Sequence, residues 1–199
     1  VLFSITAISA LLVALVNNMT KDAIALSQQQ TKNLAKFIVL DTTAEEARVE
    51  RDTTINIGDF AVTARTVVRQ SDNSATGYAV EAPSITKSGY ADRITLMVGF
   101  KEQEGETVVN LVEVLSQKET PGLGAKCVEP AFADQFRKFD VMQKKLGVKK
   151  DGGDIDAITA STITSRAYIN GIEKAVYVFA TITRTPMELD TCTGASTND

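Results

Sequence analysis

The stretch ITLMVGFKEQEGETVVNLVEVL, residues 94–115, contains two runs of alternating side chains around the polar turn KEQEGE. In the first run, one face carries Ile94, Leu96, Val98 and Phe100. In the second run, 107–115, one face is expected to carry Val108, Val112 and Val114 and the other Val109, Leu111 and Leu115. A side-chain period of two on both sides of a turn predicts an antiparallel hairpin within a larger sheet.

More strands are predicted before this hairpin, and helices are predicted after it. Residues 60–69 (FAVTARTVVR) and 77–85 also alternate, as half-buried strands do. Residues 162–183 form a long apolar-rich segment that predicts a helix, ended by Pro186. A shorter amphipathic helix is predicted from the helical spacing of Phe132, Phe136 and Phe139. Strands followed by helices indicate an α+β domain with an antiparallel sheet and flanking helices.

Residues 1–16, VLFSITAISALLVALV, are apolar at thirteen of sixteen positions, and the first charged residue is Lys21. A helix of about 20 apolar residues spans a bilayer, so residues 1–20 predict a transmembrane anchor. The alternatives are a signal peptide and a buried core helix. A small-x-small cleavage site is missing after Val16, and a helix apolar on all faces is unusual in the core of a small domain.

The rest of the chain divides by composition. Residues 17–40 show mixed three-and-four apolar spacing, which predicts that the anchor helix continues out of the bilayer. Residues 41–59 are polar and charged and are interpreted as a connecting region. The expected parts are an anchor at 1–20, a juxtamembrane helix and connector at 21–59, one globular domain at 60–185 and a loose tail at 186–199.

Composition excludes several kinds of chemistry. The chain has no histidine, which rules out Ser-His-Asp and Cys-His catalysis and histidine-bearing zinc or haem sites. Its two cysteines, Cys127 and Cys192, are too few for a four-thiolate iron–sulfur cluster, and they are either paired or free. We expect no metal site, so any redox group is an organic cofactor. The net charge of −4 argues against a nucleic-acid partner.

The first motif that carries chemistry is DAITAST, residues 156–162. It is typical of a helix start, with Thr159 or Ser161 as N-cap. A helix N-terminus also offers unpaired N–H groups and a partial positive charge, both of which favour a phosphate. The small side chains of Ala160 and Ser161 would let a bulky group approach, and the hydroxyl of Thr162 could then accept a covalent attachment.

The second motif is ETPGLG, residues 119–124. Taken alone it is typical of a turn, in which Pro121 sets φ and Gly122 supplies a positive φ. The same loop could approach a flat ligand closely. Thr120 and Leu123 would then pack against a ring, while the two glycines leave space for it.

Together, in this order and about 40 residues apart, the two motifs resemble those of one family. It comprises the covalent FMN-binding domain of the Rnf complex G subunit and the related C subunit of the sodium-pumping NADH:quinone reductase. The resemblance runs from the anchor to about Ile182. Further matching segments are SGY at 88–90, VGF at 98–100, the phenylalanine-bearing segment 132–139 and DAITASTITSRA at 156–167.

The resemblance implies that a flavin transferase recognises Asp156 and joins FMN by a phosphoester to Thr162. The chain departs from the family's usual residues at Ala160, where glycine is usual, at Ser161, where alanine is usual, and after the Gly-Tyr pair, at Ala91 and Asp92. Thr120 and Leu123 would flank the isoalloxazine ring, and Thr159, Ser161 and Thr164 would surround the phosphate. The remaining residues expected around the cofactor are Glu119, Gly122, Gly124, Ala160 and Ile163.

The function that this resemblance implies is a membrane-anchored electron-transfer component of an Rnf-type ion-translocating ferredoxin:NAD+ oxidoreductase. Its expected partners are the other subunits of that complex. The expected location is the inner membrane, with a single pass and the FMN domain on the periplasmic side. No catalytic residue and no complete active site of its own are expected. The alternatives are the C subunit of the quinone reductase and, in another class, a cofactor-free membrane-tethered interaction or sensor domain.

Overall fold

The computed structural model describes residues 2–58, 60–84, 94–103 and 106–183, and its centre is one antiparallel sheet. The six strands are neighbours in chain order: β1 (Ala47–Ile57), β2 (Phe60–Arg69), β3 (Ala75–Ser84), β4 (Ile94–Gln103), β5 (Glu106–Ser116) and β6 (Phe139–Asp140). The helices are α1 (Leu2–Ile38), α2 (Pro130–Ala133) and α3 (Thr162–Thr183), with 3-10 turns η1 (Gly124–Val128), η2 (Asp134–Phe136) and η3 (Lys149–Asp151). The predicted α+β class is confirmed.

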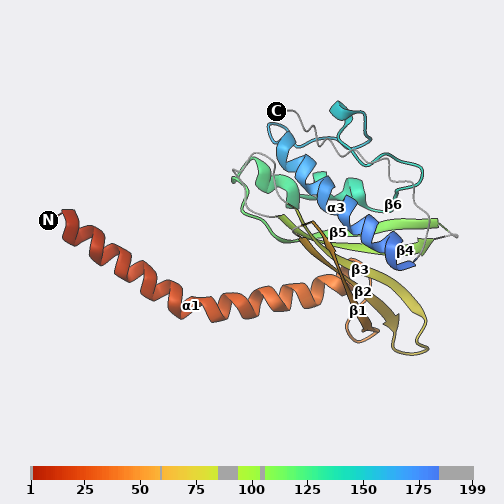
Figure 1. Ribbon diagram of the computed structural model, residues 1–199, viewed down its shortest axis with the longest axis horizontal. Coiled ribbons are helices and arrows are strands. Elements are labelled where there is room, and N and C mark those ends of the chain that lie inside the picture. The colour runs from red at the N-terminus through yellow and green to blue at the C-terminus, as the bar shows by residue number, and fades with distance from the viewer. Residues whose placement is uncertain (1, 59, 85–93, 104–105, 184–199) are drawn as a thin grey trace.

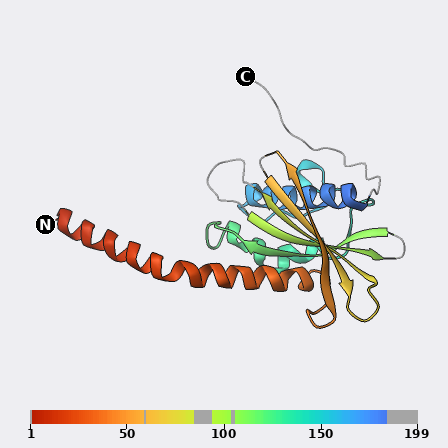
Figure 2. The same cartoon turned by 60° about the horizontal axis from the view of Figure 1, so that its bottom comes forward.

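One face of the sheet packs against α3, drawn in blue in Figures 1 and 2. The predicted apolar face of β4 points into this core, because Ile94, Leu96, Val98 and Phe100 are all fully buried. The Phe100 ring stacks on Phe179 of α3, with ring centroids 4.6 Å apart. The alternating pattern therefore identified the core-facing side of this strand correctly.

The alternation predicted for β5 is wrong before Asn110, at Val108 and Val109, because the strand contains a β-bulge. Gly99 of β4 pairs with Leu111 and Phe100 pairs with Val109, so Asn110 is the extra residue. An extra residue reverses the facing of everything before it. Val109 consequently joins Val112 and Val114 in the core beneath α3, while Leu111 and Leu115 pack on the opposite face.

Two segments differ from their predicted structure. Residues 47–57, interpreted as connector, form edge strand β1, whose backbone pairs with β2 although most of its side chains are exposed. The predicted phenylalanine helix is only four residues long, since the chain must extend again so that β6 pairs with β5. Phe132, Phe136 and Phe139 are nevertheless all buried. The predictions for residues 85, 88–93 and 186–199 lie outside the described residues, and the four-part division of the chain stays a prediction.

The predicted continuous N-terminal helix is confirmed, and α1 projects away from the sheet as one long helix that bends along its length (Figures 1 and 2). Its 37 residues give a length of about 55 Å at 1.5 Å per residue. Only its last turns pack, through Ala35 and the following Val39 and Leu40, on the face of the sheet opposite α3. The bulged Asn110 fixes this end, donating from Nδ2 to the Val39 carbonyl at 2.8 Å and to the Asp41 carboxylate at 2.9 Å.

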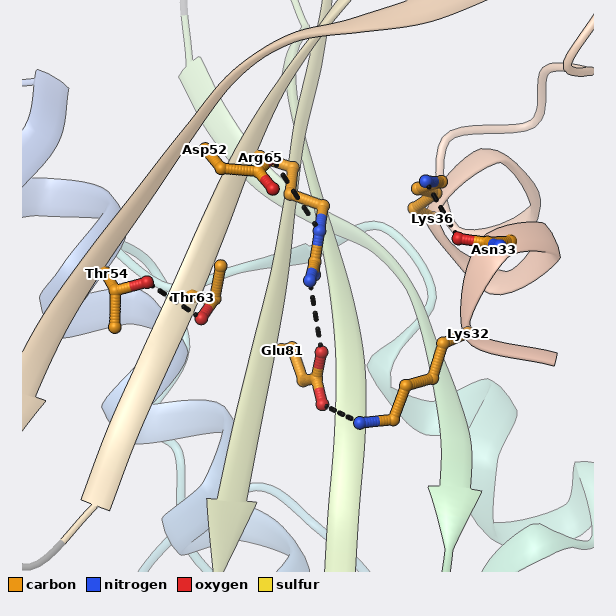
Figure 3. Close-up of polar contacts among 8 residues, drawn as sticks. All are labelled: Lys32, Asn33, Lys36, Asp52, Thr54, Thr63, Arg65 and Glu81. Carbon is orange, nitrogen blue, oxygen red and sulfur yellow. Dashed lines mark hydrogen bonds and ion pairs between the residues drawn. The ribbon is translucent and has the colours of Figure 1, made fainter. Parts of the chain in front are cut away.

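A polar chain beside this contact ties α1 to the neighbouring strands (Figure 3). Lys32 of α1 donates to the carboxylate of Glu81 on β3. The other oxygen of Glu81 accepts from Arg65 on β2 at 3.3 Å, and Arg65 also faces Asp52 on β1 at 3.8 Å. Each such pair near the surface contributes about 1 kcal/mol or less, but together they orient the helix relative to three strands.

Candidate functional site

The two sequence motifs meet in space. The hydroxyl of Thr164, in the first turn of α3, donates to the carboxylate of Glu119 at 2.8 Å across 45 residues of sequence. Gly124 lies against this pair, and a Cβ at that position would overlap the Glu119 carboxylate and sit 2.6 Å from the Thr164 hydroxyl oxygen. Glycine at 124 is therefore what lets η1 approach α3.

The loop before η1 turns outward and exposes its side chains. The carbonyl of Thr120 accepts hydrogen bonds from the backbone N–H groups of Leu123 at 3.1 Å and Ala125 at 3.2 Å. Gly122 has a φ of +76° and open space around it, as the predicted turn requires. Leu123 is 43% exposed, so the loop presents an apolar side chain to its surroundings directly beside Gly124.

The start of α3 is built by a left-handed turn. Ala160 has a φ of +60°, and the carbonyl of Ser161 accepts the first intrahelical hydrogen bond, from Ser165 at 3.1 Å. Ser161 therefore occupies the N-cap position, for which it was one of the two predicted residues. The Ser165 hydroxyl accepts from the Ile158 N–H at 2.9 Å and donates to the Ser161 carbonyl at 3.1 Å, which holds the turn from inside.

The hydroxyl groups around this helix start differ in availability. Two are buried and already bonded: Thr164 is bound to Glu119, and Ser165 to the preceding turn. Thr159 is exposed, and Thr162 is half-buried. Because Thr162 is the first residue of α3, its hydroxyl lies at the end where free N–H groups and the helix dipole favour an anion. Its neighbour Ile163 is 48% exposed and apolar.

Asp156 lies away from this contact, on an exposed surface. Its carboxylate faces Lys149 at 2.7 Å, and both side chains are mostly solvent-exposed. Gln135 clamps its backbone, accepting from the Asp156 N–H at 2.7 Å and donating to its carbonyl at 3.2 Å. Gln135 and Ser165 are positioning residues that the sequence did not single out, since neither belongs to a spacing pattern.

Two buried groups, the Cys127 thiol and the Tyr168 ring, lie near the Glu119 contact. Cys127 is a free, fully buried thiol there, and burial together with the nearby Glu119 charge raises its pKa to about 11. Tyr168, one helical turn beyond Thr164, is also fully buried, and its ring stacks on Phe136 at 5.1 Å between centroids. Within the described part of the chain, Glu119 Oε1 and the Tyr168 hydroxyl are buried without a hydrogen-bond partner.

Comparisons with known proteins place the chain in a family. The profile of the FMN-binding domain matches residues 89–177, which include both motifs. The G subunit of the ion-translocating oxidoreductase complex of Shewanella piezotolerans is 32% identical over 176 residues, covering 84% of this chain and 81% of the relative. The chain belongs to this G-subunit family. The corresponding G subunit of Methanosarcina acetivorans is 32% identical, covering 88% and 90% of the two chains.

The chain also matches a relative whose name states the reaction of its complex. The G subunit of the Na(+)-translocating ferredoxin:NAD(+) oxidoreductase complex of Acetobacterium woodii is 28% identical over 194 residues, covering 92% of this chain and 91% of the relative. The match thus extends from the domain to α1. The long N-terminal helix and the sheet domain therefore both contribute to the part of this chain that matches the relative.

The residues at the site fit FMN. The start of α3 offers a hydroxyl and free N–H groups suited to a phosphate, and the open, left-handed Gly122 leaves room on the loop. Leu123 and Ile163 are exposed apolar side chains, each next in sequence to a residue of the Glu119–Thr164–Gly124 contact. Among the described residues no group of acidic or thiol side chains could hold a metal ion. The assignment of individual residues to the cofactor stays a prediction.

Proposed function

We propose that this chain is the membrane-anchored electron-transfer component of an Rnf-type ion-translocating ferredoxin:NAD+ oxidoreductase, and that it carries FMN through a phosphoester at Thr162. The observation that supports it most is the hydrogen bond from Thr164 to Glu119, because it joins the ETPGLG loop to the helix start that bears Thr162. Membership of the G-subunit family and the FMN-binding domain match support the same proposal.

The chain's own residues hold and orient the cofactor. FMN supplies electron exchange in steps of one or two. The Thr162 hydroxyl tethers the phosphate, and the first N–H groups of α3 neutralise part of its charge. Thr120 and Leu123 face the ring from the loop, and Thr159, Ser161 and the turn at Ala160 shape the phosphate end. A tether at the phosphate leaves the ring unmodified and makes retention independent of free FMN.

We further propose that α1 anchors the domain in the membrane, with the FMN site on the periplasmic side. Among the described residues, α1 is the one helix long and apolar enough to cross a bilayer. Its large apolar side chains from Phe3 to Val16 are all exposed and need an apolar environment. The partners are then the other subunits of the complex and, during maturation, a flavin transferase that recognises the exposed Asp156.

Intact mass measurement tests the attachment. Protein from cells that contain a flavin transferase should exceed its sequence mass by one FMN less one water, and the Thr162→Ala variant should lose this addition. Thr181→Ala is the matched control, because it removes an exposed threonine hydroxyl from the same helix, far along the chain from Thr162, and should keep the flavin. In-gel fluorescence of the denatured band gives an independent readout. Unmodified wild-type protein from such cells, or a flavin that stays on Thr162→Ala, would contradict the proposal.

A further inference from the structure

Glu119 is fixed at both its backbone and its side chain. Its N–H donates to the side-chain oxygen of Gln117 at 2.6 Å, and its carboxylate accepts from Thr164 at 2.8 Å. Thr120, the residue after it, opens the exposed loop, and Thr164 stands two residues after Thr162. The carboxylate therefore connects the part of the site expected to face the ring with the part expected to face the phosphate.

The Glu119–Thr164 contact is tightly packed. Gly124 packs so closely on both partners that a methyl group there would overlap the carboxylate. Behind it lies the buried thiol of Cys127, so the carboxylate is bordered by protein rather than by water on that side. A hydrogen bond from a hydroxyl to a carboxylate is stronger than one between neutral groups, and it is stronger still where water is excluded.

The second carboxylate oxygen of Glu119 is shielded from water by the surrounding protein. Glu119 Oε1 is buried and makes no hydrogen bond within the described part of the chain. A negative charge in a region of low dielectric acts over several ångströms. Because reduction adds electrons to a flavin, a fixed carboxylate nearby opposes it.

We propose that Glu119 is a positioning residue of the flavin site, which locks the ETPGLG loop to the first turn of α3 and, through its negative charge, lowers the midpoint potential of the flavin. The inference rests on the proposed function, because it needs FMN at this site. Its two parts are separable: the lock depends on the hydrogen bond to Thr164, and the electrostatic effect depends on the charge.

The charge is tested with the full chain, loaded in flavinylating cells and titrated spectroscopically through the flavin absorbance. Glu119→Gln keeps an oxygen that accepts from Thr164, so the loop stays locked, and the flavin that the variant carries should have a midpoint potential shifted to more positive values. Glu129→Gln is the matched control, since Glu129 is an exposed acid on the same segment without a side-chain cap bond. Equal potentials for the two variants would overturn the electrostatic part.

The lock is tested without flavin, by a double-mutant cycle on the full chain produced in cells lacking a flavin transferase. Glu119→Ala and Thr164→Val should each lower Tm, and the double variant should fall no further than the larger single change. Additive Tm shifts would overturn the lock. If the wild-type chain from flavinylating cells carries no FMN, the proposed function is rejected instead. The Tm cycle can still be interpreted in that case, because it is measured on protein without flavin.

Discussion

The left-handed turn at Ala160 leads to a prediction about stability. Its φ of +60° places an L-residue where the Cβ crowds the backbone, at a cost of about 1–2 kcal/mol. Glycine removes this crowding but adds about 0.4–1 kcal/mol of chain entropy to the unfolded state. We therefore expect Ala160→Gly to raise the free energy of unfolding by about 0.5–1 kcal/mol.

Thermal unfolding of the full chain in detergent, followed by circular dichroism, measures the effect. For a protein of this size the expected gain corresponds to a rise in Tm of about 1–4 °C. Ala180→Gly makes the same chemical change inside α3, where it should instead destabilise by about 1 kcal/mol. If Ala160→Gly lowers Tm as Ala180→Gly does, α3 is not preceded by a left-handed residue, and the geometry given for the Thr162 site is wrong.

Three further predictions concern the Glu119 contact, the end of α1 and the buried thiol of Cys127. Gly124→Ala should destabilise by about 1–3 kcal/mol through overlap with Glu119 and Thr164 and reduce FMN content by intact mass, whereas Gly122→Ala, in open space, should cost only the left-handed penalty of about 1–2 kcal/mol. Gly99→Ala would overlap the carbonyl of Val39, so the end of α1 should detach from the sheet; hydrogen exchange at Val39 and Leu40 should accelerate, while exchange in α3 should not. The folded pKa of Cys127, about 11, lies above its ordinary value of 9.0, so the unfolded chain loses this proton first as pH rises. Its contribution to stability should be complete below pH 9 and should fall between pH 9 and 11, and a pH series of urea unfolding should show a shallower fall for Cys127→Ala.

The sequence predicted an element well where the element buries side chains at the period of its own backbone, and poorly where a neighbouring strand defines it. The predicted bounds of β2 and α3 agree with the structure, because their apolar residues follow the period of the backbone itself. Strand β1 was missed because it lies at the edge of the sheet and pairs through its backbone, with little burial to mark it. The bulge at Asn110 was missed because an extra residue in one strand is defined by its partner strand.

The features of the site likewise fall into those that the sequence could predict and those that depend on the folded structure. Its two motifs, the turn glycine Gly122 and the helix start at Thr162 could be recognised along the chain, because turns and helix ends have local residue preferences. The sequence could not indicate that Thr164 and Ser165 use their hydroxyls internally, since their partners depend on how the preceding turn and η1 fold against α3.

The sequence by itself determined the kinds of element in this protein: an apolar helix at the N-terminus, an antiparallel sheet, a long helix after it, and two motifs suited to a phosphate and a ring. These follow from side-chain periodicity and local backbone preference, which act over a few residues. Only the tertiary structure decided that Glu119 meets Thr164, that Gly124 sits between them and that Asn110 holds the end of α1. Such contacts join residues 45 and 71 positions apart, and packing of whole elements, rather than local preference, brings them together.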